Sequence, residues 1–259
     1  MFSQALIQTG VSFQNFTTLN RERGLHRRGI RFRRYNAQER ILIVVIPGKP
    51  HEWLHKNLYL EMWSEIFLMG LRDAWNNDGA TTSFRGQGHP GGDDMDRDAG
   101  EPDSSGSPWP GRGGREAWPT LIIEAGVSST LAGLRMDMEW WFSASEHQVK
   151  IVLLAKLDRH TKRIILEKWV ETGQPPRPGP VTRAAARLTN TPRPCRTQEI
   201  TINWPDNTPN LPASYAVTSG NLRLEFDLLF LRPPGPGEGD VVVTVPRLQL
   251  WASRVWSAV

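Results

Sequence analysis

Three short runs of almost continuously apolar, β-branched residues most constrain what this chain can fold into. They are ILIVVIP (residues 41–47), PTLIIEAG (119–126) and VKIVLLAKL (149–157). Runs of this length are typical of strands buried on both faces, because a strand with one solvated face alternates apolar and polar residues. The runs therefore predict a sheet that other elements cover on both sides.

Two amphipathic segments can supply the helices that cover such a sheet. From residue 51 to about 75, directly after Pro50, apolar residues recur at spacings of three and four, which predicts a long helix. Ser128, Ser129 and Thr130 offer N-caps for a second helix over about 131–142.

The order of these elements predicts a mixed α/β fold with a central sheet flanked by helices. The sheet is expected to contain strands at 41–46, 119–125, 149–157 and 163–170, the last two joined as a hairpin by DRHTK. A β-rich C-terminal extension is expected from strands at 199–204, 221–231 and 240–245, followed by a short helix.

Composition divides the chain into one domain, an arm and two loops. Residues 41–259 are expected to form the single domain. Residues 1–40 lack a sustained period and are expected to form a basic N-terminal arm that is irregular or partly helical. Gly, Asp, Ser and Pro dominate residues 76–117, which predicts a disordered or inserted loop. A basic, Pro-rich loop is expected at about 171–196.

The net charge of +4, from 31 Lys+Arg against 27 Asp+Glu in 259 residues, hides a strong segregation. Eight Arg and two Glu give residues 21–40 a charge of +6, and five Arg without an acid give residues 175–196 a charge of +5. Arginine-rich segments of this kind favour a polyanionic partner such as nucleic acid. The alternative is that both segments are solvated and only keep the protein soluble.

Other features indicate an intracellular protein, cytoplasmic or nuclear and not secreted. The N-terminus lacks the pattern of a signal peptide, and no apolar run approaches the roughly 18 residues that span a bilayer. We therefore expect no membrane partner. Cys195 is the only cysteine, which excludes an internal disulfide and a multi-cysteine zinc site.

The sequence His51-Glu52-Trp53-Leu54-His55 has the H-E-x-x-H spacing of zinc proteases, in which two histidines bind the metal and the glutamate activates water. Its position in the first helical turn argues against that function, as does Glu61 at the place of a further histidine ligand. A zinc protease is therefore kept only as an alternative.

Three carboxylates, Glu52, Asp103 and Glu124, form a second candidate site. Glu124 ends an apolar strand, where a buried carboxylate is costly unless it is paired. A divalent metal shared with Asp103 would be such a partner, and Mg²⁺ prefers oxygen ligands of this kind. Alternatively, Glu124 pairs with Arg135 or caps the helix that follows.

Several segments resemble a family of fungal proteins with a PD-(D/E)XK restriction-endonuclease-like fold and, more distantly, bacterial Uma2-type endonuclease-like domains. The resemblance extends over roughly residues 35–170. The segments that carry it are EPD (101–103), WPTLIIEAGVSS (118–129), LRMDMEWW (134–141) and VKIVLL (149–154).

The resemblance implies a nuclease that cleaves nucleic acid phosphodiesters with Mg²⁺ or Mn²⁺. Asp103 and Glu124 correspond to the metal-binding acids, and Glu52 to a helix-borne glutamate upstream of them. Gly126 stands where the motif has lysine, so Lys150 or Arg135 is the expected replacement. The residues expected to bind nucleic acid are Arg27, Arg28, Arg31, Arg33, Arg34 and Arg135.

The missing lysine keeps a second hypothesis open, that of a catalytically inactive member of the same fold that binds nucleic acid or a protein partner. The sequence does not determine the oligomeric state, although a homodimer is compatible with it.

Overall fold

A seven-stranded mixed sheet forms the centre of the computed structural model, which describes residues 4–26, 29–86, 97–173 and 192–259. Only β8 and β9 run parallel, and every other described neighbour in this sheet is antiparallel. In spatial order the strands are β12 (Ala216–Val217), β11 (Arg193–Asn203), β10 (Arg163–Thr172), β9 (Ile151–Asp158), β8 (Leu121–Gly126), β7 (Ser104–Pro108) and β4 (Trp75–Asn77). The mixed α/β class and the strands predicted at 119–125, 149–157 and 163–170 are confirmed.

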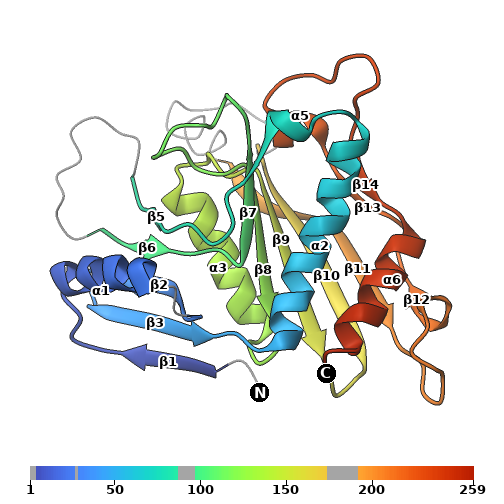
Figure 1. The fold of residues 1–259 in the computed structure, drawn as a ribbon, viewed down its shortest axis with the longest axis horizontal. Helices are drawn as coiled ribbons and strands as arrows, with labels where there is room; N and C mark the ends of the chain where they lie inside the picture. Colours follow the sequence, from blue (N-terminus) through green and yellow to red (C-terminus); the bar gives the residue numbers. More distant parts are fainter. Residues whose placement is uncertain (1–3, 27–28, 87–96, 174–191) are drawn as a thin grey trace, which may run out of the picture.

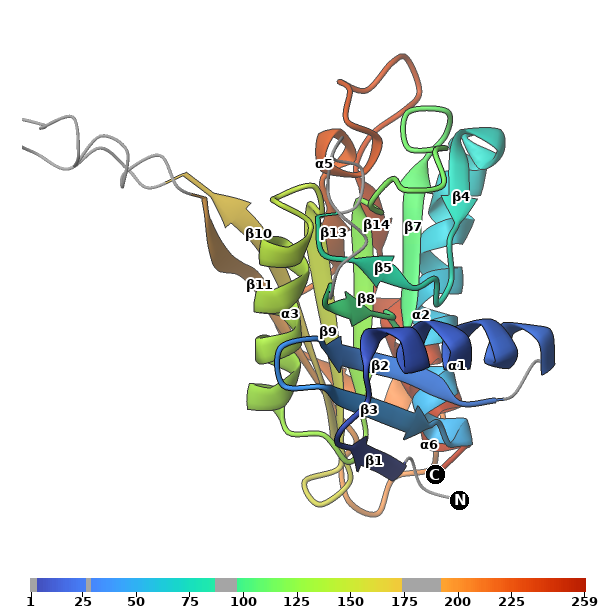
Figure 2. The same ribbon diagram turned by 90° about the vertical axis from the view of Figure 1, so that its left-hand side faces the viewer.

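Helices cover both faces of this sheet (Figures 1 and 2). Helix α3 (Leu131–Ala144) connects the parallel strands β8 and β9 and packs on one face. The opposite face is covered by α2 (Lys49–Leu68) and α6 (Val245–Trp256), which contact each other. Thr130 caps α3 as expected, because its side chain accepts a hydrogen bond from the Gly133 N–H.

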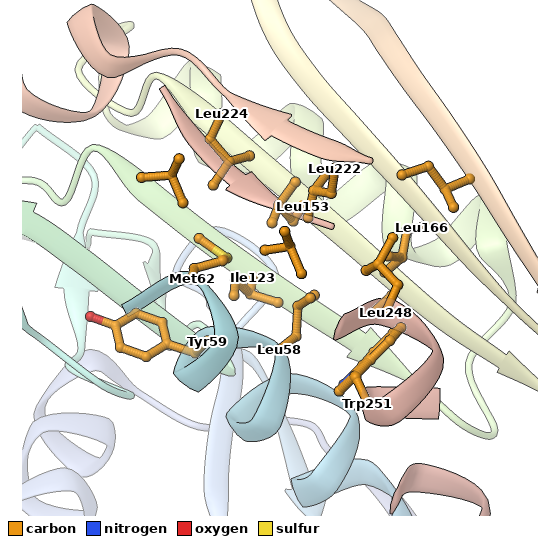
Figure 3. Close-up of a cluster of buried hydrophobic side chains, with 14 of the residues drawn as sticks. Leu58, Tyr59, Met62, Ile123, Leu153, Leu166, Leu222, Leu224, Leu248 and Trp251 are labelled. Carbon is orange, nitrogen blue, oxygen red and sulfur yellow. The ribbon is translucent and has the colours of Figure 1, made fainter. Parts of the chain in front are cut away.

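Strand β8 is apolar apart from Glu124 because both of its faces are buried. Ile123 belongs to the larger core, with Leu58 and Met62 of α2 and Trp251 of α6 (Figure 3). Ile122 points to the other face and packs with residues of α3 in a separate cluster. The alternation of side chains along a strand thus joins two hydrophobic cores through one short segment.

The sequence predicted an irregular or partly helical arm over residues 1–40; the described residues of this segment form a helix and two strands that belong to a sheet. A second sheet contains β1 (Gln4–Gln8), β3 (Ile41–Ile46), β2 (Arg31–Asn36), β6 (Ala99–Gly100) and β5 (Ser83–Phe84), in that spatial order. Helix α1 (Phe13–His26) packs on it, with the Phe16 ring stacked on Tyr35 at 4.4 Å. Strands β1 to β3 cross the direction of the central strands (Figure 2).

The run ILIVVI forms a strand, β3, but outside the central sheet. Only Leu42 and Val45 of β3 are buried, and both edges of the strand pair with N-terminal strands. The predicted place of residues 41–46 was wrong because an apolar run does not specify its partner strands. Strands β2 and β3, which lie on either side of residue 40, pair with each other.

Part of the loop expected at 76–117 is regular structure. It contributes β5, β6 and the buried strand β7, whose sequence SSGSP has no large apolar residue. Small residues are required in β7 because a Cβ on Gly106 would lie 2.7 Å from the Trp75 side chain. Residues 87–96, and residues 174–191 of the loop expected at 171–196, lie outside the described part of the chain.

The C-terminal extension contains fewer strand residues than expected. The run 221–231 forms β13 (Leu222–Leu224), which pairs with β14 (Val241–Val243), and then the short helix α5 (Phe226–Phe230). The long helix expected over 51–75 ends at Leu68, before the short 3₁₀ helix η1 (Arg72–Ala74). None of the described helices has the length and apolar character needed to cross a membrane.

Truncation of Leu58 to alanine is expected to lower the free energy of unfolding by about 2–5 kcal/mol, because the side chain is fully buried between α2 and β8. Chemical denaturation of the purified chain measures this loss. Leu68→Ala is the matched control, since Leu68 ends the same helix and is 72% exposed. Equal losses in the two variants would contradict the packing described for α2.

Candidate functional site

The central sheet brings Asp103 and Glu124 together. Ser104 of β7 pairs with Ile123 of β8 in an antiparallel register, so Asp103, which precedes β7, lies beside Glu124. Both side chains are buried, and both line a cavity of about 20 Å³. A cavity of that size holds about one water molecule or one small ion.

Asp103 receives hydrogen bonds from three other elements. Arg31 of β2 donates to Oδ1, and the Ala125 N–H of β8 donates to Oδ2 at 2.6 Å. His51 of α2 places its Nε2 3.2 Å from Oδ2. Burial alone would raise the pKa of Asp103, but the charges of His51 and Arg31 hold it well below its usual range.

Glu124 has the opposite electrostatic environment. Burial, together with the nearby charge of Asp103, raises its pKa to about 8. The Trp141 Nε1–H of α3 donates to its Oε1 at 2.6 Å. Glu124 therefore contacts the following helix through Trp141, but it neither pairs with Arg135, which binds Glu167, nor caps that helix, whose N-cap is Thr130.

Glu52 lies in the first turn of α2, where Pro50 opens the helix. Its Oε1 lies 3.4 Å from His55 Nε2 and 3.9 Å from His51 Nδ1, and Lys56 pairs with its other oxygen. Although burial opposes ionisation, these three neighbours hold the pKa of Glu52 well below its usual range. The H-E-x-x-H residues are thus assembled in space.

Ser104 of β7 and Asp103, which directly precedes β7, orient the two histidines. Ser104 Oγ lies 2.8 Å from His55 Nδ1, while Asp103 raises the pKa of His51 to about 9 against the effect of burial. Burial lowers the pKa of His55. At neutral pH the two rings therefore favour different protonation states.

A groove of about 720 Å³ runs past these groups. Glu52 and Asp103 both line it, as do Arg31, Lys56 and Tyr59. Glu52, Asp103 and Glu124 thus occupy one region, with Asp103 lining both the groove and the small cavity.

The expected lysine replacements lie elsewhere. Lys150 precedes β9, and Leu154, four residues further on, is the partner of Glu124. The offset is about 13 Å along the strand. Lys150 Nζ instead donates to the His147 carbonyl, and Arg135 donates to Glu167. Neither side chain joins the carboxylates.

Lys156 is a residue that the sequence did not single out. In the parallel register of β8 and β9 it pairs with Gly126, and its Nζ donates to the Val127 carbonyl at 2.7 Å. A Cβ on Gly126 would lie 2.9 Å from Leu134 of α3, which explains why a side chain is excluded there. Helix α3 separates β8 from β9 in the sequence, so only the register of these two strands shows that Lys156 lies beside Gly126.

The arginines of β2 are taken up by internal ion pairs. Arg31 pairs with Asp103, while Arg33 and Arg34 both pair with Asp137 of α3. Arg34 also lies 3.5 Å above the Trp140 ring. These side chains therefore do not form the exposed basic arm that was expected to bind nucleic acid. Arg27 and Arg28, two further residues expected to bind it, lie outside the described residues.

Comparison with known proteins gave no family for the chain: no protein-family model matches it, and a search of curated proteins found no match. The site is therefore argued from its own geometry.

The variant Glu124→Gln is expected to flatten the pH dependence of stability. Between the ordinary pKa of 4.5 and the folded value of about 8, the unfolded chain ionises first, so the parent loses stability as pH rises through this range. Glutamine cannot ionise, which removes a loss of about 3–5 kcal/mol. Denaturation with EDTA present, from pH 4.5 to 8.5, measures the difference.

Glu139→Gln on the exposed side of α3 is the matched control and should follow the parent curve. Parallel curves for the parent and Glu124→Gln would show that Glu124 does not titrate in this range.

Proposed function

We propose that this chain is a PD-(D/E)XK-like, metal-dependent nuclease. The observation that carries the proposal is the placement of Asp103 and Glu124 on neighbouring strands, around a cavity of about 20 Å³. The same two residues are the metal ligands that the family resemblance implies.

The donor set fits Mg²⁺ or Mn²⁺. Both ions prefer carboxylate oxygens, and a cation between the two side chains would relieve the repulsion that contributes to the raised pKa of Glu124. When bound there, the metal would polarise a phosphate and lower the pKa of a water molecule.

The remaining residues have roles that follow from their positions. The groove beside the carboxylates would take the substrate strand, with Lys56 and Arg31 on its walls to attract phosphates. Lys156 takes the role that was expected of Lys150 or Arg135, which is to stabilise the phosphate. Alternate residues of a strand share a face, so Lys156 lies on the face of the sheet to which Glu124 and Gly126 belong.

One observation favours the alternative of an inactive protein that binds nucleic acid or another protein. Arg31 and His51 already compensate the charge of Asp103, so this carboxylate needs no metal to remain ionised. In that case the groove would be a binding surface without hydrolytic activity.

Cleavage assays with Mg²⁺ or Mn²⁺ test the proposal on single- and double-stranded DNA and RNA. Asp103→Asn and Glu124→Gln are each expected to lower the cleavage rate at least ~100-fold, because each removes an anionic metal ligand. Glu139→Gln should retain the parent rate, and circular dichroism should show that all variants are folded.

Equal cleavage by the parent and both site variants would sink the metal-site assignment. A folded parent that binds nucleic acid without cleaving it under either metal would support the inactive alternative instead.

A further inference from the structure

The first turn of α2 carries a second set of potential metal ligands, distinct from the Asp103–Glu124 pair. His51, Glu52 and His55 each offer one ligand atom, and these atoms all lie within 4.8 Å of one another. Two donors bound tetrahedrally at about 2.1 Å from one ion are about 3.4 Å apart. The distances of 3.4 and 3.9 Å from Glu52 Oε1 to the two ring nitrogens are close to that spacing.

Each histidine has its other nitrogen held by a partner outside the set. His51 Nε2 faces Asp103 Oδ2 at 3.2 Å, and His55 Nδ1 faces Ser104 Oγ at 2.8 Å. Outer partners of this kind fix the ring orientation and direct the free nitrogen at a metal. His51 Nδ1 and His55 Nε2 are therefore the nitrogens left to converge on Glu52.

One ring nitrogen of the set is buried without a hydrogen-bond partner among the described residues. His51 is 4% exposed, and within the described part of the chain its Nδ1 has no hydrogen-bond partner. Leaving a buried polar atom unpaired is costly. A cation between the two histidines and Glu52 would satisfy it, with His51 bound as the neutral ring that keeps its Nε2–H toward Asp103 and uses Nδ1 as the ligand.

From this geometry we infer that His51 Nδ1, Glu52 Oε1 and His55 Nε2 form a site for a divalent transition metal of the Zn²⁺ type. Two imidazoles and one carboxylate suit Zn²⁺ and related ions, whereas Mg²⁺ prefers oxygen ligands alone. Glu52 acts here as a ligand, unlike the water-activating glutamate of a zinc protease.

The surroundings determine what such a metal can do. Glu52 lines the groove of about 720 Å³, which leaves coordination positions open to water or an anion. Arg31 Nη2 lies 3.4 Å from His55 Nε2 and is held by the Asp103 carbonyl at 2.6 Å, so it can keep its bonds to Asp103 when the ion takes the ring nitrogen. Lys56 pairs with Glu52 and must turn away, and in the groove it would attract an anionic ligand to the metal.

Zn²⁺ titration of the EDTA-treated full-length chain by calorimetry, with millimolar Mg²⁺ present, tests the site. We expect one Zn²⁺ per chain in the parent, and affinity at least ~100-fold weaker in Glu52→Gln and in His55→Ala. Ser104→Ala should weaken binding about 10–100-fold by freeing the His55 ring. Co²⁺ should give visible absorption bands in the parent that both ligand variants lose.

His147→Ala is the matched control, because His147 forms an exposed histidine–carboxylate pair with Glu171. Parent-like affinity in both ligand variants, loss of binding in His147→Ala, or no binding by the folded parent would each overturn the site. If His55→Ala does not fold, Glu52→Gln decides, since its side chain is partly exposed.

Glu124→Gln separates this site from the proposed nuclease centre. It should retain Zn²⁺ affinity even where phosphodiester cleavage is lost. A matching loss of Zn²⁺ affinity in Glu124→Gln would instead place the ion at the Asp103–Glu124 pair and overturn the assignment to α2.

Discussion

The packing of the N-terminal sheet, α2 and the central sheet depends on the bonds that the buried Asp103 carboxylate makes to all three. This carboxylate joins four parts of the chain, because it lies at the start of β7 and contacts Arg31 of β2, His51 of α2 and the Ala125 N–H of β8. Removing one partner of a buried ion pair costs about 3–5 kcal/mol, since the other charge is left uncompensated. The N-terminal sheet is held against the central sheet at this point.

The pairing of buried charges also explains the charge segregation of the sequence. The basic segment at 21–40 lies against acids from distant parts of the chain: Arg23 pairs with Glu101, and Arg33 and Arg34 pair with Asp137. Arg23 and Arg34 also lie over the rings of Phe32 and Trp140. Four arginines of this segment, Arg23, Arg31, Arg33 and Arg34, are therefore neutralised inside the protein.

Both proposed metal sites lie at this junction. Glu124, raised in pKa beside Asp103, belongs to an all-oxygen pair, whereas His51 and His55 supply nitrogen donors a short distance away. Asp103 serves both groups, as a neighbour of Glu124 and as the partner of His51 Nε2.

Local patterns identified β8, β9, β10, α3 and the start of α2, because their periodicity and caps depend on neighbouring residues alone. They failed for β7, whose Ser and Gly residues are buried only because Trp75 and the flanking strands surround them. They also failed for β3, which is a strand as predicted but pairs with β1 and β2. Strand partners are selected by contacts between distant segments, which periodicity does not encode.

The sequence by itself determined the α/β class, the buried strand that carries Glu124 and the helical turn that carries His51, Glu52 and His55. Only the tertiary structure decided that Asp103 lies between these two groups, that Arg31 compensates its charge, and that Lys156, not Lys150, lies beside Gly126. The reason is physical. Local backbone preferences fix where a strand or helix begins, whereas sheet register and the pairing of buried charges fix which distant side chains meet.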